Sequence, residues 1–542
     1  MRCRLNVTAQ RRVLCVFPAY TPSFGTFSHA YRLMHDVRAF MPPQGLLLIA
    51  AYMPPQWQVR FVDENIARAS GADLDWADVV LVSGMHIQAP QIRDIHRRVK
   101  AAGKVMALGG PSVSAAPEMY PEIEYLHIGE LGDGTDALIA ALDGGVAPPP
   151  AQLRFETKER LPLTDFPIPA YDLIPLPRYL LCTLQFSSGC PYQCEFCDIP
   201  GLYGRQPRFK TAAQISAELD AICAQTGHPT VVYFVDDNFI GNRKAARDML
   251  PHLIAWQKQH FYPMQFACEA TLNIAKQTEI LRLMREASFG GLFVGIETPE
   301  AEALKAMRKD HNNSLPMIAA IKTLNDYGLE VSAGIILGLD TDSDDTEARL
   351  QDFIELSHIP MLTINLLQAL PKTPLWDRLE KAGRLNDDPQ RESNVEFRRP
   401  YDEVVAMWRR AIAHANDPER LFARFQYQID ATYANQLIPP ARGKLTLANL
   451  RRGAVLAYNV FVQAGFKSDY RRHFWRAARH ALRRGQIDAV LSIGFMTHHL
   501  IQFTREALRD EQNASFYSAK GRVPQVEKTP QQDAAPALRK SA

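Results

Sequence analysis

Short apolar runs alternate with helical stretches in two separate parts of this chain of 542 residues. In the first part, from Arg12 to about Leu142, the runs are rich in valine and leucine. Short runs of this kind between helices are typical of parallel strands that are buried on both faces. The alternation predicts a doubly wound, Rossmann-like α/β domain whose ligand lies at the carboxyl ends of the strands. The predicted strands are 13–17, 59–62, 79–82 and 105–108, and the predicted helices are 45–52 and 91–102.

A second series of apolar runs, from about Tyr179 to Arg384, has the same rhythm and predicts a partial (β/α)6 barrel. Functional side chains of such barrels lie at the carboxyl ends of the strands. Prolines crowd the stretch between the two series, which is typical of a linker. The predicted barrel strands are 184–187, 231–235, 265–268, 291–296, 331–337 and 362–367. The predicted domains are 1–143 (Rossmann-like), 144–178 (linker), 179–395 (barrel), 396–511 (mostly helical) and 512–542 (a polar tail, expected to be disordered).

The composition describes an ordinary water-soluble protein, with 46% hydrophobic and 22% charged residues. A net charge of +2 implies no general attraction to nucleic acid or to anionic lipid, and we expect no nucleic-acid partner. Eight cysteines without a signal peptide indicate a reducing cytoplasm and a metal or redox use for some of them. No run reaches the roughly 18 apolar residues that a membrane-spanning helix needs.

Three cysteines, Cys190, Cys194 and Cys197, follow the first predicted barrel strand with the spacing C-x3-C-x2-C. They place three thiolates on one short loop and leave a fourth metal position without a cysteine. A [4Fe–4S] cluster normally takes four cysteines, so three leave one iron open to another ligand. The alternative is a structural zinc site, which closes all four positions with a second pair of cysteines or histidines. No such pair lies nearby, and the ligand count therefore favours the open cluster.

Acidic residues follow the next predicted barrel strands. Asp236 and Asp237 are adjacent, and two carboxylates at one strand end repel each other unless a cation or an amino group lies between them. Either aspartate is alternatively a helix cap. Glu269 follows the third strand, and Gly295 and Glu297 lie at the end of the fourth, where Glu297 is alternatively structural.

The predicted strands of the first domain also end in short polar or glycine-containing segments, which are 63–65, 83–85 and 109–111. Glycine lets a ring system approach the backbone closely, as Gly109 and Gly110 would allow here. The alternative is a Rossmann-like module that binds a nucleotide or nothing. The first strand is not followed by G-x-G-x-x-G, which weakens the dinucleotide version.

The cysteine loop and the order of these strand-end segments resemble the cobalamin-dependent radical SAM family. Among its members the chain is most similar to those that methylate C-2 of hopanoid lipids, on its whole length and on the segments 22–27, 40–45, 197–205 and 365–374. The resemblance implies a [4Fe–4S] cluster on the three cysteines, S-adenosylmethionine and cobalamin. For S-adenosylmethionine it implies Asp236 or Asp237 at the amino group, Glu269 at the ribose, and Gly295 with Glu297 at the adenine.

For cobalamin the resemblance implies Asn65, Ser83, Gly109 and Gly110. Asn65 stands where the family carries a cobalt-ligating histidine, and Arg68 replaces a glycine of the same motif. We therefore expect cobalamin without a histidine ligand at that position. His86 is the alternative ligand, or else a hydrogen-bonded structural residue.

The implied reaction is radical C-methylation of an unactivated ring carbon. A 5′-deoxyadenosyl radical removes a hydrogen atom and methylcobalamin delivers the methyl group. The implied partners are a hopanoid lipid and an electron donor such as flavodoxin or ferredoxin. Two alternatives remain: a related enzyme that methylates or cyclises another scaffold, such as a tetrapyrrole or an antibiotic precursor, and a non-catalytic cobalamin or Fe–S sensor.

The region from about Tyr401 to Arg509 is predicted to be helical and is rich in arginine and aromatic residues, as in 470–476. On amphipathic helices this composition fits peripheral contact with the inner membrane surface. It equally fits solvated helices whose aromatic face is buried in a core. No RNA-binding motif is present.

Overall fold

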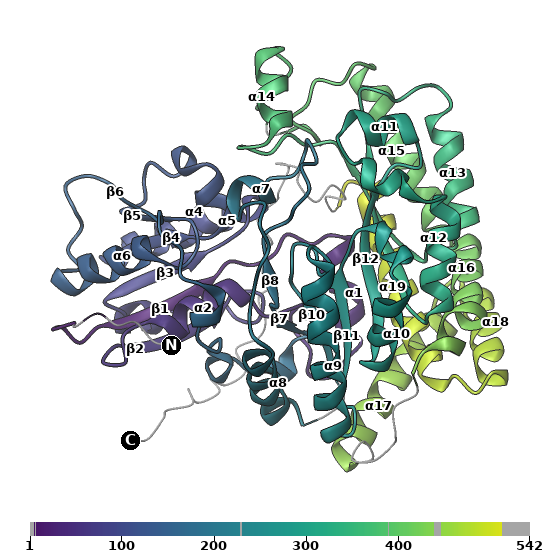
Figure 1. The fold of residues 1–542 in the computed structure, drawn as a ribbon, viewed down its shortest axis with the longest axis horizontal. Helices are drawn as coiled ribbons and strands as arrows, with labels where there is room; N and C mark the ends of the chain where they lie inside the picture. Colours follow the sequence, from purple (N-terminus) through teal and green to yellow (C-terminus); the bar gives the residue numbers. More distant parts are fainter. Residues whose placement is uncertain (1–4, 6, 228–229, 389, 438–445, 512–542) are drawn as a thin grey trace.

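The computed structural model describes residues 5, 7–227, 230–388, 390–437 and 446–511. It confirms the predicted α/β class, because the chain forms two six-stranded sheets in which every strand pairing is parallel. Figure 1 shows the first sheet beside the barrel, with the C-terminal helices on the far side of the barrel. The predicted tail, 512–542, lies outside the described residues.

The first sheet has the strand order β2-β1-β3-β4-β5-β6. Two of its strands escaped prediction, because β5 contains a histidine and β6 is an exposed edge strand without an apolar run. β6 lies within the segment that we expected to be a linker. The strands are β1 Arg12–Phe17, β2 Gln58–Asp63, β3 Val79–Ser83, β4 Val105–Gly109, β5 Tyr125–Ile128 and β6 Leu153–Glu156. The helices are α1 Ser28–Tyr31, α2 Gln44–Tyr52, α3 Gly71–Trp76, α4 Ala89–Ala101, α5 Pro111–Ala115 and α6 Asp133–Gly144.

The second sheet forms a partial barrel with the order β14-β13-β12-β11-β10-β7, so that β14 and β7 are its edges. Its strands are β7 Cys182–Leu184, β10 Thr230–Phe234, β11 Met264–Glu269, β12 Phe289–Glu297, β13 Glu330–Leu337 and β14 Met361–Leu366. Its helices are α7 Ile199–Leu202, α8 Ala212–Thr226, α9 Arg243–Gln259, α10 Thr278–Glu286, α11 Ala301–Ala306, α12 Met317–Asp326, α13 Thr346–Ser357 and α14 Pro374–Lys381.

The first barrel strand ends earlier than predicted. β7 stops at Leu184, and β8 (Ser187–Ser188) pairs instead with β9 (Arg208–Phe209) in a small antiparallel ladder. The chain leaves the sheet here because the Asp236 carboxylate accepts the backbone N–H groups of Phe186 and Ser187. The turn brings the following residues over the carboxyl end of the barrel.

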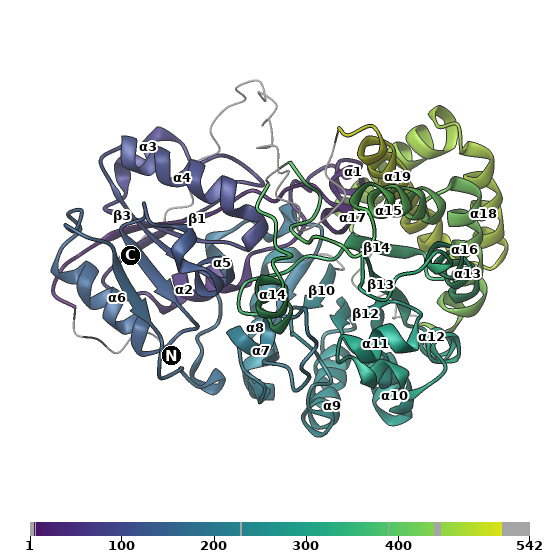
Figure 2. The ribbon, with the colours of Figure 1, turned by 90° about the horizontal axis from the view of Figure 1, so that it is seen from above.

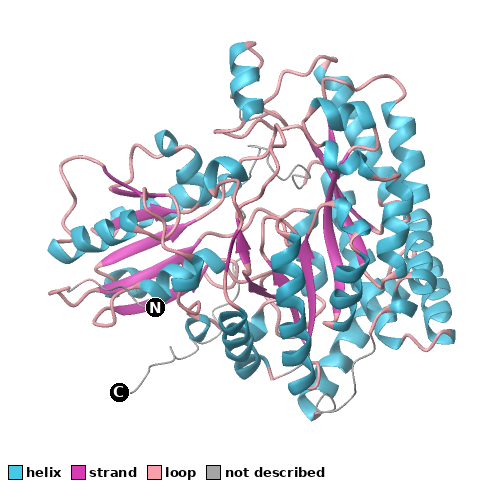
Figure 3. Ribbon diagram, viewed as in Figure 1, coloured by secondary structure: helices cyan, strands magenta, loops and turns pink. Residues whose placement is uncertain are grey.

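The C-terminal region is helical, as predicted (Figure 3). Its last helix, α19, lies beside α1 and near β14, at the open side of the barrel (Figure 2). His29 joins the two helices through Glu506, at 3.0 Å, and His499 bonds the Phe24 carbonyl at 2.9 Å. None of the described helices is long and apolar enough to cross a membrane. The helices are α15 Tyr401–Ala415, α16 Pro418–Ala431, α17 Leu447–Val460, a π-helix Phe461–Lys467, α18 Arg471–Arg483 and α19 Ile487–Leu508.

The interior of the barrel is hollow. Along β13 buried residues alternate with residues that face the interior, because helices cover only the outer side of the sheet. Several interior positions carry little or no side chain, including Ala267, Gly291, Gly295 and Gly334. Barrels of this type are usually filled by large side chains at such positions. Here the small residues leave open space, which is part of a cavity of about 2060 Å³ that extends beyond the barrel.

Candidate functional site

The cavity joins parts of the chain that are far apart in sequence. Its wall includes the three cysteines at the carboxyl end of the barrel, together with Met85 and His86 of the first domain. The C-terminal region contributes residues of α19. Pockets for one small ligand usually measure 300–1,000 Å³, so about 2060 Å³ has room for more than one.

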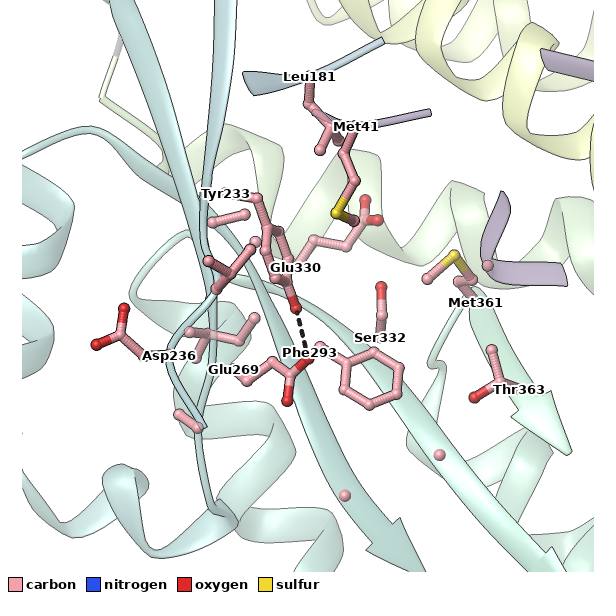
Figure 4. Close-up of a pocket in the computed structure, with 18 of the residues that line it drawn as sticks. Met41, Leu181, Tyr233, Asp236, Glu269, Phe293, Glu330, Ser332, Met361 and Thr363 are labelled. Carbon is pink, nitrogen blue, oxygen red and sulfur yellow. Dashed lines mark hydrogen bonds between the residues drawn. The ribbon is translucent and has the colours of Figure 1, made fainter. Parts of the chain in front are cut away.

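The two predicted aspartates hold the start of the cysteine loop through its backbone. Both oxygens of Asp236 accept backbone N–H groups, and the side chain points away from Glu269 in Figure 4. Asp237 accepts the N–H of Gly189 at 2.7 Å and also lines the cavity. Burial raises the pKa of Asp236 to about 6 and that of Asp237 to about 7. Only one Asp237 oxygen is bonded to the loop, which leaves the other for a ligand, whereas both oxygens of Asp236 are bonded to it.

A buried ion pair supports the loop from the other side. Lys309 bonds Glu297, lies 5.5 Å from the ring of Phe196, and is almost fully buried. A side chain at Gly295 would collide with the Glu297 carboxylate and come within 2.6 Å of Lys309 Nζ, so this position requires glycine. Sequence reasoning missed Lys309, because nothing in its local pattern connects it with the distant cysteines.

The ring of Tyr192, inside the cysteine loop, is also fixed. It stacks on His311 with 3.8 Å between ring centroids, and its hydroxyl accepts a hydrogen bond from Asn273 at 2.7 Å. Sequence reasoning missed both partners, since they lie on short 3-10 helices without a recognisable motif. The loop is thus braced on several sides before any ligand binds.

Glu269 points into the cavity beside Tyr233, whose hydroxyl lies 3.4 Å from the carboxylate (Figure 4). The carboxylate is exposed to the cavity but enclosed by the barrel, and desolvation there, followed by the nearby Asp237 charge, raises the pKa of Glu269 to about 7. A carboxyl group in this state accepts a hydrogen bond when ionised and donates one when protonated. It is therefore suited to bind hydroxyl groups of a ligand.

The residues predicted for cobalamin lie at the carboxyl edge of the first sheet. Of these, the Asn65 side chain bonds Tyr20 N at 2.7 Å and Asp63 at 2.6 Å, so both of its ends are engaged. A side chain at Gly110, with φ of 93°, would collide with the Ser83 hydroxyl. Among the described residues that line the cavity, none of the four predicted residues (Asn65, Ser83, Gly109 and Gly110) appears, although their neighbours do.

His86 is the neighbour that stands out on this edge. It lines the cavity, Ser112 Oγ lies 3.3 Å from its Nδ1, and burial lowers its pKa. The imidazole is therefore neutral near pH 7, which is the form that binds metals.

The first domain and the barrel are tied together at this edge. Glu130 accepts hydrogen bonds from Ser188 at 2.9 Å and from Arg208 at 2.5 Å. Arg160 donates to the carbonyls of Leu202 and Tyr203, at 2.8 and 2.7 Å. Arg160 also pairs with Glu130 at 3.2 Å, so these contacts form one network that ties the carboxyl edge of the first sheet to the loops of the barrel.

The donor set of the loop fits an iron–sulfur cluster. Burial raises the pKa of all three cysteine thiols, and metal binding would remove those protons. In the described part of the chain, no three histidine, cysteine or acidic side chains converge on a point as a single ion requires. A [4Fe–4S] cluster does not need its cysteines to converge on one point, because each thiolate binds a different iron.

Comparisons with known proteins agree with this geometry. Residues 184–354 match the radical SAM superfamily, and residues 373–513 match a domain of unknown function, DUF4070. The hopanoid C-2 methylase of Rhodopseudomonas palustris (strain TIE-1) is 58% identical over 508 residues, which cover 94% of this chain and 96% of that protein.

Two solved structures share the fold at 14% sequence identity. The cobalamin-dependent S-adenosylmethionine radical enzyme OxsB, with aqua-cobalamin bound, aligns with a TM-score of 0.56 over 94% of this chain and 83% of its own. The radical S-adenosylmethionine methyltransferase TsrM from Kitasatospora setae aligns with a TM-score of 0.56 over 89% of this chain and 100% of its own. The chain belongs to the radical SAM superfamily and, within it, to the family of the hopanoid C-2 methylase.

Proposed function

We propose that this chain is a radical SAM methyltransferase that methylates an unactivated ring carbon, C-2 of a hopanoid lipid. The observation that carries the proposal is the 58% identity to the hopanoid C-2 methylase over nearly the whole of both chains. The site supports it, because the three cysteines and an edge of the first domain open onto one cavity.

In this proposal Cys190, Cys194 and Cys197 hold a [4Fe–4S] cluster. Asp237 and Glu269 are the carboxylates assigned to S-adenosylmethionine, while Gly295 makes room for the Glu297–Lys309 pair and itself lines the cavity. When bound, the cluster and S-adenosylmethionine supply a hydrogen-abstracting radical, and cobalamin supplies a transferable methyl group.

Cobalamin is assigned to the space between the two carboxyl edges. Ser83, Gly109 and Gly110 would form the wall behind it, and His86 reaches the cavity from that edge together with Met85 and Pro111. Asn65 is assigned a structural role, since its side chain is already bonded at both ends.

The protein itself positions and shields the reactants. A saturated ring carbon has neither an acidic proton nor a nucleophile, so general acid–base catalysis has nothing to act on. The chain contributes an apolar wall that excludes water, with Phe293 and Met361 from the barrel and Phe495 and Met496 from α19. Orientation and exclusion of water are the usual contributions of the protein in cofactor-dependent radical chemistry.

Peripheral membrane contact fits a lipid substrate. The C-terminal region exposes large apolar side chains, including Leu447 at 87%, Tyr458 at 69%, Phe466 at 67% and Ile487 at 66%. Exposed apolar and basic residues on helices bind anionic membrane surfaces. Cosedimentation with anionic vesicles tests this, and a Leu447→Ser/Ile487→Ser variant should lose it. A low-potential donor such as flavodoxin or ferredoxin is assigned as the reductant, and replacement of dithionite by either one tests that.

The function is tested in a bacterium that makes hopanoids but no 2-methylhopanoids. We expect the intact gene to produce 2-methylhopanoids, detected by mass spectrometry of the lipids, and the Cys194→Ala gene to produce none. Absence of product, despite folded protein that carries iron and cobalamin, would refute the hopanoid assignment and favour another scaffold.

A further inference from the structure

Polar side chains also occur in the amino half of the barrel, away from the cysteines. Strand register places Glu269, Phe293 and Ser332 in one row across the sheet. The next row toward the amino end holds Ala267, Gly291 and Glu330. Because alanine and glycine fill little of that row, the cavity continues past Glu269 to the Glu330 carboxylate.

Glu330 is held in place by the C-terminal region. Its Oε2 accepts a hydrogen bond from the hydroxyl of Tyr433, which also lines the cavity. Gln436 bonds the carbonyl of Gly290 at 3.3 Å and lies on the same wall. The far end of the cavity is therefore built jointly by the barrel and by the segment that follows α16.

Two further polar groups of this end have no protein partner. Gln265 and Ser332 line the cavity, and neither side chain forms a hydrogen bond with another residue in the part of the chain that the structure describes. Around them the wall is apolar, with Met41, Leu181 and Met361 (Figure 4). A few polar groups on a mostly apolar wall are what fixes the orientation of a ligand in a pocket.

The cavity is also long. From Glu330 to Ile336 the wall follows β13 over six residue-to-residue steps, which is about 20 Å at roughly 3.3 Å per step. The cysteine loop lies at the other end, beyond the carboxyl ends of the strands. The shape suits an elongated, rigid ligand that is apolar along its length and polar at one end.

We propose that Glu330, Tyr433, Gln265 and Ser332 form a binding site for the hydroxyl-bearing end of a fused-ring lipid. The opposite, apolar ring end then lies at the cysteine loop. This inference rests on the proposed function, because it takes the lipid as the ligand, and it adds the direction in which the lipid lies. Hydroxyl groups suit the site, since the carboxylate accepts from them and the amide of Gln265 both donates and accepts.

Photo-crosslinking of the full-length holoenzyme tests the orientation. The probe is a triterpenoid polyol with a diazirine at the end of its hydroxylated chain, and mass spectrometry locates the adduct. We expect the adduct in peptides that contain Glu330, Tyr433 or Gln265, and excess unlabelled polyol should suppress it. An adduct confined to 85–86 or 192–199 would overturn the proposal. Because this readout needs no turnover, an adduct at Glu330 without methylation refutes the proposed function but not the site.

Substrate preference gives a second test. The wild-type enzyme should have a KM for the polyol about tenfold below that for a hydrocarbon with the same rings. Glu330→Leu should remove this preference by raising the KM for the polyol alone, and Tyr433→Phe should weaken it. The matched control is Thr363→Val, whose lost hydroxyl donates to the Ala333 carbonyl at 3.3 Å and takes no part in the Glu330–Tyr433 bond. If folded Glu330→Leu and Tyr433→Phe enzymes both keep the wild-type preference, the site is refuted.

Discussion

In both parallel sheets of this chain strands alternate with helices along the sequence, but the two sheets differ in how their faces are buried. In the first sheet β3 and β4 are buried at four consecutive positions, because helices cover both faces. In the barrel β13 alternates between buried and cavity-facing positions, because helices cover the outer face alone. Valine and leucine fill the first sheet, whereas glycine and alanine line much of the second.

The first sheet therefore serves as a scaffold, whereas the barrel encloses ligands. Apolar side chains fill the first sheet, which positions the residues at its strand ends. In the barrel, small interior side chains leave space for ligands. Added side-chain volume should therefore affect stability in the first sheet and ligand binding in the barrel. Four predictions compare the two regions, beginning with the largest effect.

The largest effect is expected when a thiol of the cavity is removed. Cys194→Ala should abolish iron binding and the cleavage of S-adenosylmethionine, because a cluster ligand is lost. Cys15→Ala in β1 and Cys268→Ala on the outer face of β11 remove fully buried thiols that do not line the cavity, and both variants should retain iron. Iron per chain and 5′-deoxyadenosine yield are the measurements. Full iron content in Cys194→Ala would contradict the assignment.

The second effect concerns buried charge. Lys309→Met leaves Glu297 unpaired in the barrel and should reduce stability by about 3–5 kcal/mol. The matched change in the first domain is Arg98→Met, whose pair with Glu64 at 2.7 Å is more exposed, and its cost should be clearly smaller. Calorimetric melting measures both. The double variant Lys309→Met/Glu297→Leu should recover most of the loss, and a double variant as unstable as the single would argue against this explanation.

The third effect is expected from adding volume to each sheet. Ala107→Leu in β4 has no space and should cost about 1–3 kcal/mol of stability. Gly291→Leu has space, because the nearest atom to its added Cβ would be Ala267 Cβ at 3.7 Å. That variant should fold normally and lose lipid binding. Melting temperature and product yield distinguish the two, and a strongly destabilised Gly291→Leu would show that the barrel is not hollow there.

The smallest effect is a pH dependence. The pKa of Glu269 rises from 4.5 to about 7 on folding, so between these values the folded chain holds a proton that the unfolded chain has released. Its contribution to stability is complete below about pH 4.5 and is lost as pH rises through about 7. Glu269→Gln should flatten the melting temperature of the apoprotein over this range. Asp63→Asn should do the same up to about pH 6, the pKa of Asp63 in the first domain. An unchanged profile in Glu269→Gln would contradict the shift.

Most elements of the fold follow from local patterns. Valine-rich runs identified β1 to β4, and the later runs identified the barrel, because burial of a parallel strand demands continuous apolar residues. β5 and β6 need no continuous apolar run, since they are short and lie toward or at the edge of the sheet. The structure brings the three cysteines, Asp237 and Glu269 to one cavity, as the spacing of strand ends suggested.

The roles of some site residues depend on contacts that no local pattern reveals. Asp236 and Asn65 have the expected positions, but their polar atoms already bond backbone groups or neighbouring side chains, and of the two only Asp236 lines the cavity. Lys309 is invisible in sequence because its partners lie on another strand end and on the cysteine loop.

By itself, the sequence determined the alternation of strands and helices, the two parallel sheets and the three cysteines on one loop. These depend on periodicity and spacing, which act over a few residues. Only the tertiary structure decided that the barrel is hollow, that α19 and the segment after α16 line it, and that Glu330 meets Tyr433 at its far end. The reason is physical: a cavity and its polar contacts arise where surfaces from distant segments meet, and that geometry exists only once the chain has packed.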